Sequence, residues 1–133
     1  MPTWTLMELE IVLRAAWSAA TCDPVDLPDW HPGNPARGQC GVTALVLQDL
    51  LGGDLMLGQV HVDGEQIMWH WWNRLPGGLE VDLTREQFAP HEVVVGGEML
   101  ERPAGPPKRC REQYELLRAR VLDALGTETP AAE

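Results

Sequence analysis

The sequence is poor in basic residues and has no long apolar run. Ten Lys and Arg stand against 20 Asp and Glu, so the net charge is −10. This balance argues against a protein that follows nucleic-acid phosphates or binds an anionic membrane. No stretch of about 18 apolar residues occurs, and the first residues lack the basic and apolar regions of a signal peptide. We expect a cytoplasmic protein with no nucleic-acid or membrane partner.

Cysteines are also few, and they match no standard framework. Cys22, Cys40 and Cys110 are odd in number and have no Cys-x-x-Cys spacing. Such a set is typical of reduced thiols in a cytoplasm rather than of a disulfide scaffold. We expect no structural disulfide, no cofactor and no bound metal.

The residues that are present indicate one globular domain. The chain has 133 residues, 44% of them apolar, so we expect a single domain over residues 1–133. A domain of this size hides roughly two thirds of its unfolded surface. Six Trp accompany one Phe and one Tyr, which is an unusual aromatic content. The sequence leaves the oligomeric state open.

Three helices are predicted from apolar periodicity. Thr5 followed by Glu8 has the form of a capping box, and it starts an amphipathic helix over residues 5–20. Residues 39–51 form a helix that is apolar on nearly every side and is therefore expected to be buried. The last helix covers residues 110–125 and has one apolar face.

Between the second and third helices the pattern changes to that of strands. Asp63-Gly64 is a strong hairpin signal, and Gly96-Gly97 is expected to end the last strand. The predicted strands cover residues 55–62, 66–74, 79–83 and 91–95. The element order predicts an α+β domain in which the Cys40-bearing helix packs on an antiparallel meander of about three to five strands.

A proline-rich loop precedes the second helix. Residues 23–37 contain four prolines, which exclude a regular helix or a central strand. The same stretch carries Trp30, His31 and Asn34, so we expect it to be pinned against the domain. Asn34 is a candidate substrate contact.

Cys40 is the candidate nucleophile. It lies at the expected first turn of a buried helix, where the helix dipole and the unpaired N–H groups favour a thiolate. The structural alternative is that Cys40 is a small buried apolar residue. A nearby base decides between these two interpretations.

His70 and Asp82 lie on neighbouring predicted strands, and the hairpin register decides whether they meet. A loop of Leu75-Pro76-Gly77 places His70 directly opposite Asp82, with Cβ atoms about 5 Å apart. A register shifted by one residue keeps both on one face as diagonal neighbours, whereas a two-residue loop places them on opposite faces. In the first two registers, a His–carboxylate hydrogen bond is expected.

The favourable registers supply the parts of a thiol-based acyl-transfer site. Cys40 would attack, His70 would act as base, and Asp82 would orient the ring and stabilise imidazolium. The N–H of Cys40 and the side chain of Gln39 are candidate oxyanion donors. An alternative is a zinc site of Cys40, His61, His70 and Asp82, although this spacing matches no standard ligand motif.

A function of a different class also fits the residues. Trp72, Arg74 and Arg85 are expected near the same sheet face and would line a ligand groove. In a non-catalytic module on the same fold, this groove would bind a small molecule or a peptide without chemistry at Cys40.

The chain resembles the YunG-like family of small bacterial proteins over nearly its whole length. The residues that carry the resemblance are Asn34-Pro35, Gly38-Gln39-Cys40, Thr43-Ala44-Leu45-Val46, His70, Trp72-Asn73-Arg74-Leu75-Pro76, Val81-Asp82-Leu83-Thr84-Arg85 and Gln87-Phe88, with Thr21-Cys22 and Tyr114-Glu115-Leu116-Leu117.

More distantly, the chain is similar to transglutaminase-like and papain-like cysteine enzymes. The order of Cys40, His70 and Asp82 matches their triad, and Asp82-Leu83-Thr84 matches their Asp-x-Thr, whereas no Gly-Trp-Cys-type motif surrounds Cys40. This similarity implies a papain/transglutaminase-like core. It also implies an amidase, peptidase or transamidase that acts on a small-molecule or peptide amide.

Overall fold

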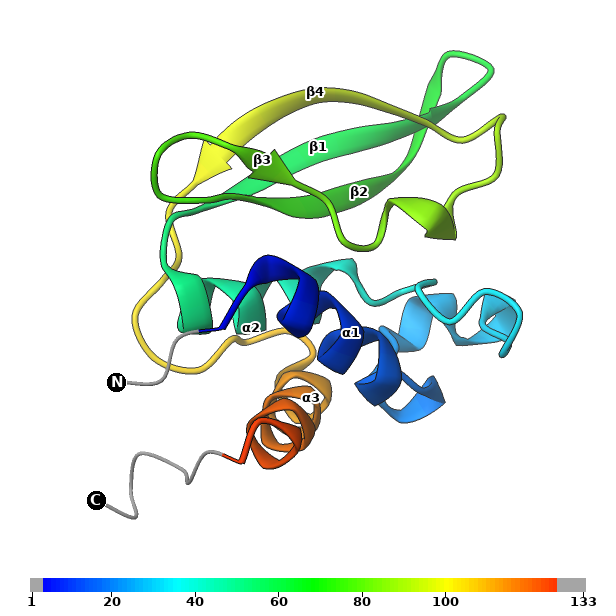
Figure 1. Ribbon diagram of the computed structural model, residues 1–133. Coiled ribbons are helices and arrows are strands. Elements are labelled where there is room, and N and C mark those ends of the chain that lie inside the picture. Colours follow the sequence, from blue (N-terminus) through cyan, green and yellow to red (C-terminus); the bar gives the residue numbers. More distant parts are fainter. Residues whose placement is uncertain (1–3, 127–133) are drawn as a thin grey trace.

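An antiparallel four-stranded sheet lies over a layer of helices in the computed structural model, which describes residues 4–126 (Figure 1). The expected α+β class is confirmed. The helices are α1 (Leu6–Ala16), α2 (Cys40–Leu51) and α3 (Arg111–Ala124), with short 3₁₀ helices η1 (Ala19–Thr21), η2 (Pro24–Asp29) and η3 (Arg85–Gln87). The strands are β1 (Asp54–Val62), β2 (Glu65–Arg74), β3 (Glu80–Val81) and β4 (Val93–Leu100). None of the helices within residues 4–126 has the length and apolar character needed to cross a bilayer.

Helix α1 begins as expected and ends early. The Thr5 side chain accepts from the Glu8 N–H and the Glu8 carboxylate accepts from the Thr5 N–H, which confirms the capping box. The helix stops at Ala16 rather than continuing to residue 20, because Trp17 turns extended and Ser18 caps the separate helix η1. The Trp17 indole N–H then donates to Thr43 Oγ1 of α2 at 2.9 Å.

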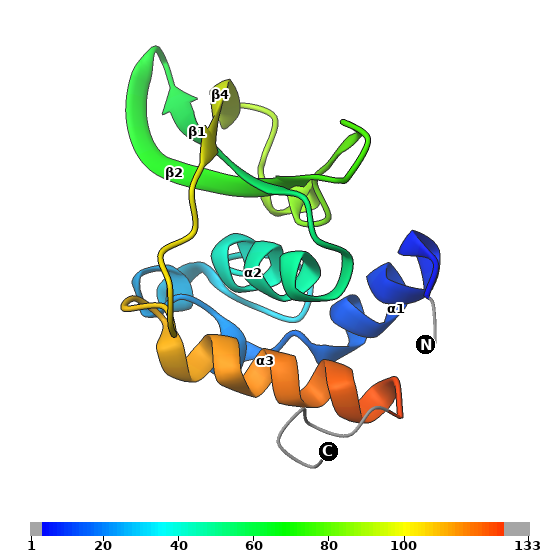
Figure 2. The ribbon, with the colours of Figure 1, turned by 90° about the vertical axis from the view of Figure 1, so that its left-hand side faces the viewer.

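Helix α2 lies between the sheet and α3, with α1 beside it (Figure 2). It begins at Cys40, one residue later than predicted, and its end before Gly52 agrees with the sequence prediction; Gly52 has the positive φ of 78° that favours glycine there. Most of the apolar core lies among the three helices and consists of Leu9, Leu13, Ala16, Trp17, Ala36, Val42, Val46, Leu47, Tyr114, Leu117 and Val121. The helix that carries Cys40 is therefore held on two sides.

The sheet has the strand order β3-β2-β1-β4, so the expected meander is wrong for the last strand. The Asp63-Gly64 hairpin joins β1 and β2 as predicted, but β4 crosses back to pair with the free side of β1. Strand β4 also runs through Gly96-Gly97 instead of ending there. The two glycines form a bulge, which appears as a register shift between Leu57 and Gln59 of β1.

The register between β2 and β3 is the one that makes His70 and Asp82 diagonal neighbours on the same face of the sheet. Asn73 pairs with Val81 and Arg74 with Glu80, and the Leu75 N–H donates to the Leu79 carbonyl. The loop is therefore Pro76-Gly77-Gly78, and direct opposition of His70 and Asp82 is wrong. The observed register still leaves the two residues on one face.

Candidate functional site

His70 is bonded to Asp82 at the centre of the site. The His70 side chain is fully buried, and its Nε2 lies 2.6 Å from Asp82 Oδ2. The second carboxylate oxygen, Oδ1, accepts from the backbone N–H of Thr84 at 3.2 Å. This bond fixes the carboxylate in the orientation that the ring needs.

Two aromatic side chains hold the remaining surfaces of the His70 ring. Trp72 stacks on it with centroids 5.6 Å apart and an interplanar angle of 25°. Phe88 approaches edge-on, with a centroid distance of 4.7 Å and an angle of 84°. Within residues 4–126, His70 Nδ1 is buried and has no partner in hydrogen-bond geometry. Because Asp82 occupies Nε2, Nδ1 is the nitrogen left for the thiol of Cys40.

The environment of His70 favours imidazolium. Burial lowers the pKa of the ring, but the hydrogen bond to Asp82 and the nearness of the Cys40 thiol, together with the charges of those two residues, outweigh burial and raise the pKa to about 9. The ring is therefore protonated at neutral pH. The sequence analysis assigned Asp82 the stabilisation of imidazolium, and the direction of this pKa shift agrees with that assignment.

The backbone before α2 places Cys40 at the start of the helix. Gly38 has a φ of 73°, and an added Cβ would meet the Cys22 sulfur and the Cβ of Asp26. Farther along the helix, the side chain of Asn73 on β2 donates to the Ala44 carbonyl at 2.9 Å. This buried bond fixes α2 against the strand that carries His70.

Gln39 does not have the expected role. Its side chain is fully buried and points into the loop region that follows α1. The amide nitrogen donates to the Ser18 carbonyl at 3.0 Å, and the amide oxygen accepts from Thr21 Oγ1 at 2.8 Å. We therefore correct the oxyanion assignment: Gln39 anchors the residue before Cys40, because its amide is already bonded elsewhere.

The other predicted contacts lie at different distances from the ring. Trp72 joins the site through its stacking on His70, whereas Arg74 lies beyond it and pairs with Asp54 at 3.6 Å. Arg85 donates to the Asp82 carbonyl at 3.3 Å from an exposed position. Asn34 is used structurally, since its amide donates to the backbone carbonyl of Gln87 at 3.0 Å.

Comparison with known proteins identifies the family. A profile of the family described as YunG protein matches residues 5–126. The chain belongs to the YunG family. The family relative described as "Uncharacterized protein YunG", from Bacillus subtilis (strain 168), is 38% identical over 80 residues. That alignment spans 60% of this chain and 60% of the relative. No solved structure matches the chain.

Gln87 connects the two halves of the site, and sequence reasoning missed it. Its amide nitrogen donates to the carbonyl and the hydroxyl of Thr84, at 3.1 and 3.0 Å. Its amide oxygen accepts from the Gly38 N–H at 3.2 Å. One buried side chain thus links the turn after Asp82 to the loop before Cys40. The Asp-x-Thr pattern was the signal for Thr84, but no local pattern marks Gln87 because its partner is distant in sequence.

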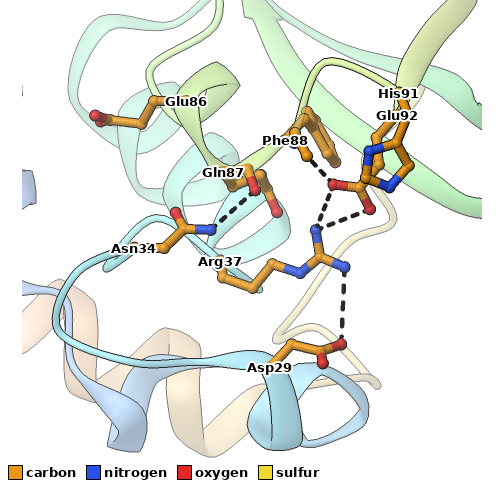
Figure 3. Close-up of a pocket in the computed structure, with 9 residues that line it drawn as sticks. Asp29, Asn34, Arg37, Glu86, Gln87, Phe88, His91 and Glu92 are labelled. Carbon is orange, nitrogen blue, oxygen red and sulfur yellow. Dashed lines mark hydrogen bonds and ion pairs between the residues drawn. The ribbon is translucent and has the colours of Figure 1, made fainter.

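A polar cavity of about 470 Å³ is lined in part by Phe88, the residue that approaches the His70 ring edge-on (Figure 3). At its centre Arg37 is 8% exposed and donates to both carboxylate oxygens of Glu92 at 3.2 Å. Asp29 lies 3.8 Å from the same guanidinium. The residues lining it are Asp29, Asn34, Arg37, Glu86, Gln87, Phe88, Ala89, His91 and Glu92. Cys40 is not among them.

The described residues do not support the alternative of a zinc site. In the part of the chain that the structure describes, no three His, Cys, Asp or Glu residues are grouped so that they could hold a metal ion. His61 instead lies with its Nε2 2.8 Å from the side-chain oxygen of Gln59. The arrangement therefore offers a histidine between a thiol and a carboxylate, without a set of metal ligands.

Proposed function

We propose that the chain is a cysteine-dependent acyl-transfer enzyme, an amidase, peptidase or transamidase, with a Cys40–His70–Asp82 triad. The observation that carries the proposal is the fully buried His70 ring, with Asp82 2.6 Å from Nε2, Nδ1 without a partner, and Cys40 near enough to raise the pKa of the ring. A thiol, an imidazole and an orienting carboxylate in this order are the parts of nucleophilic acyl transfer. The substrate would be a small-molecule or peptide amide.

The raised pKa of His70 suits a thiolate–imidazolium pair. The Cys40 thiolate attacks the amide carbonyl carbon, which forms a C–S bond and an oxyanion. The oxyanion collapses and breaks the C–N bond, while imidazolium gives its proton to the departing amine. Neutral His70 then takes a proton from water, or from an acceptor amine, as that nucleophile attacks the thioester. Release of the acid or of the new amide restores the pair.

Two features support a papain/transglutaminase-like arrangement. Cys40 is the first residue of α2, where the unpaired N–H groups face an incoming oxyanion and the helix dipole favours negative charge. His70 and Asp82 come from the β2–β3 hairpin that packs over this helix (Figure 1). With Gln39 bonded elsewhere, we assign the oxyanion contact to the N–H of Cys40 itself.

Alkylation of Cys40 tests the proposal, and the other two cysteines are internal controls. Burial raises the pKa of Cys22 to about 12 and that of Cys110 to about 11, so both stay protonated and unreactive near pH 7. We expect iodoacetamide to modify Cys40 first, as measured by peptide-resolved mass spectrometry. His70→Ala should slow this modification about a hundredfold. A Cys40 that reacts no faster than a free-thiol peptide, with or without His70, contradicts the mechanism.

An acyl-enzyme gives a second, direct readout. Incubation with an activated ester such as p-nitrophenyl acetate should add one acetyl group to Cys40, and hydroxylamine should remove it. The matched variant Cys40→Ser keeps the size of the side chain and should stay unmodified. An acetyl group that appears equally on Cys40→Ser would show that the reaction occurs elsewhere.

The cavity beside Phe88 favours one other function, that of a binding module. Its lining is polar, it is built around Arg37, and it excludes Cys40, so it suits a ligand that never meets the thiol. In that case Cys40→Ser would leave ligand binding and biological activity intact. Arg37→Met would abolish both, because it removes the guanidinium at the cavity centre.

A further inference from the structure

We infer that Trp72 is a positioning residue that holds the His70 ring in line with Asp82, and that Gly58 and Gly97 leave the space, the glycine seat, that its indole occupies. The inference rests on the proposed function for its catalytic meaning. Its structural part concerns the orientation of one ring and is testable by itself.

The indole is fixed at three points. One face stacks on His70 at 5.6 Å, and the indole N–H donates to Glu80 Oε1 on the neighbouring strand at 2.8 Å. The far end of the indole lies over two glycines, Gly58 of β1 and Gly97 of β4. A ring held in this way has little freedom to rotate, so the surface it presents to His70 is constant.

Gly58 and Gly97 are required because the indole of Trp72 lies too close to both positions to leave room for a Cβ atom. Neither glycine is needed to reverse the direction of the chain. A Cβ at Gly58 would lie 2.8 Å from two atoms of the indole, and a Cβ at Gly97 would lie 2.9 Å from it. Gly58 is the β1 partner of His70, and Gly97 belongs to the bulge of β4. The bulge that was unexpected from the sequence therefore provides room for Trp72 directly beside the catalytic candidate.

If Trp72 positions the His70 ring, its removal changes the pKa of His70 in one direction; if Trp72 only buries the ring, its removal changes that pKa in the opposite direction. Burial lowers the pKa of the ring, while the aligned hydrogen bond with Asp82 and the nearby Cys40 thiol raise it. If Trp72 only excluded water, its removal would raise the pKa of His70. If Trp72 holds the ring in line, its removal weakens the hydrogen bond with Asp82 and lowers the pKa of His70 from about 9 toward the ordinary value of 6.5.

The experiment compares Trp72→Leu and Trp72→Phe with the wild type. The His70 pKa is measured by NMR titration of the ring carbons, assigned with His70→Gln, and the alkylation rate of Cys40 is measured across the same pH range. Trp72→Leu should lower the pKa and slow alkylation at pH 7 about tenfold, because a small misalignment is costly. Trp72→Phe keeps a stacking ring and should stay within about twofold of wild type.

The glycine seat supplies a rescue test. Gly58→Ala should displace the indole and reproduce the effects of Trp72→Leu. Combining it with Trp72→Phe should bring the His70 pKa and the alkylation rate most of the way back to the wild-type values, because phenylalanine lacks the far ring that the new Cβ meets; the remaining contact of that Cβ is with the Val95 carbonyl oxygen at 3.2 Å. Gly96→Ala is the control: it strains a positive φ of 76° in the same bulge, but its Cβ meets nothing within 4 Å. It should lower stability without changing the His70 pKa.

The outcomes separate this inference from the proposed function. A pKa of His70 that rises or stays constant in Trp72→Leu, with unchanged alkylation, overturns the positioning role. Failure of the rescue overturns the role of the glycine seat. If the ring titration follows the expectation but Cys40→Ser retains full biological activity, the proposed chemistry fails while the ring-holding role of Trp72 stands. Circular dichroism confirms that each variant is folded.

Discussion

The stability of the protein should depend on the charge of His70, and the expected dependence follows from the structure. A ring whose pKa is about 9 in the folded state and 6.5 in the unfolded state binds its proton more tightly when folded. The resulting stabilisation is fully present below pH 6.5 and is lost as pH rises through 9. The difference between these two pKa values corresponds to about 3 kcal/mol.

The measurement is urea unfolding followed by tryptophan fluorescence at pH 6, 7, 8 and 9, for the wild type and for His70→Gln. The free-energy difference between the two proteins isolates the titration of His70, because the other groups titrate in both. We expect this difference to fall by about 3 kcal/mol between pH 6 and pH 9. Asp82→Asn should reduce the fall, since it removes the carboxylate that hydrogen-bonds to the ring.

A pH-independent difference would refute the reasoning. It would mean that His70 titrates near its unfolded value and that its contacts with Asp82 and Cys40 do not favour imidazolium. The measurement stops at pH 9 because above it the raised pKa values of Cys22 and Cys110 also make stability fall.

Three further substitutions test the framework of the site. Gly38→Ala should destabilise by about 2 kcal/mol in urea unfolding, because it combines a positive φ with a clash against Cys22; unchanged stability would contradict the tight turn. Gln39→Leu should cost about 2 kcal/mol from two lost buried hydrogen bonds, while acyl transfer per folded molecule is retained; a selective loss of activity would restore the oxyanion role. Gln87→Leu should slow Cys40 alkylation as well as destabilise, since it separates the two halves of the site; an unchanged rate would show that the link is dispensable.

The parts of the fold that could be predicted from sequence are those set by local chemistry. Thr5 and Glu8 are three residues apart and form the expected capping box, and the Asp63-Gly64 turn joins the expected strands. The boundaries of α2 follow from an apolar run that two glycines end. In each case the residues that decide the structure are neighbours in the chain.

The parts that could not be predicted depend on residues far apart in the chain. Gly96-Gly97 has the composition of a strand end, but pairing with β1 carries β4 through it as a bulge. Turn chemistry allowed more than one register between β2 and β3, so the contact of His70 with Asp82 could only be stated conditionally. The role of Gln39 was missed because its partners lie near the end of α1, and no local pattern announces them.

The site draws its parts from two layers, and this has a consequence for protein synthesis. Cys40 belongs to the helical layer, while His70 and Asp82 belong to the hairpin above it (Figure 1). The ribosome makes the thiol well before its histidine and carboxylate. In the proposed mechanism, a nascent chain therefore carries an ordinary cysteine, and the reactive pair would arise only after the hairpin has been made and has docked on α2. For the proposed enzyme, the order of synthesis would thus keep the thiol of Cys40 inactive until the hairpin is in place.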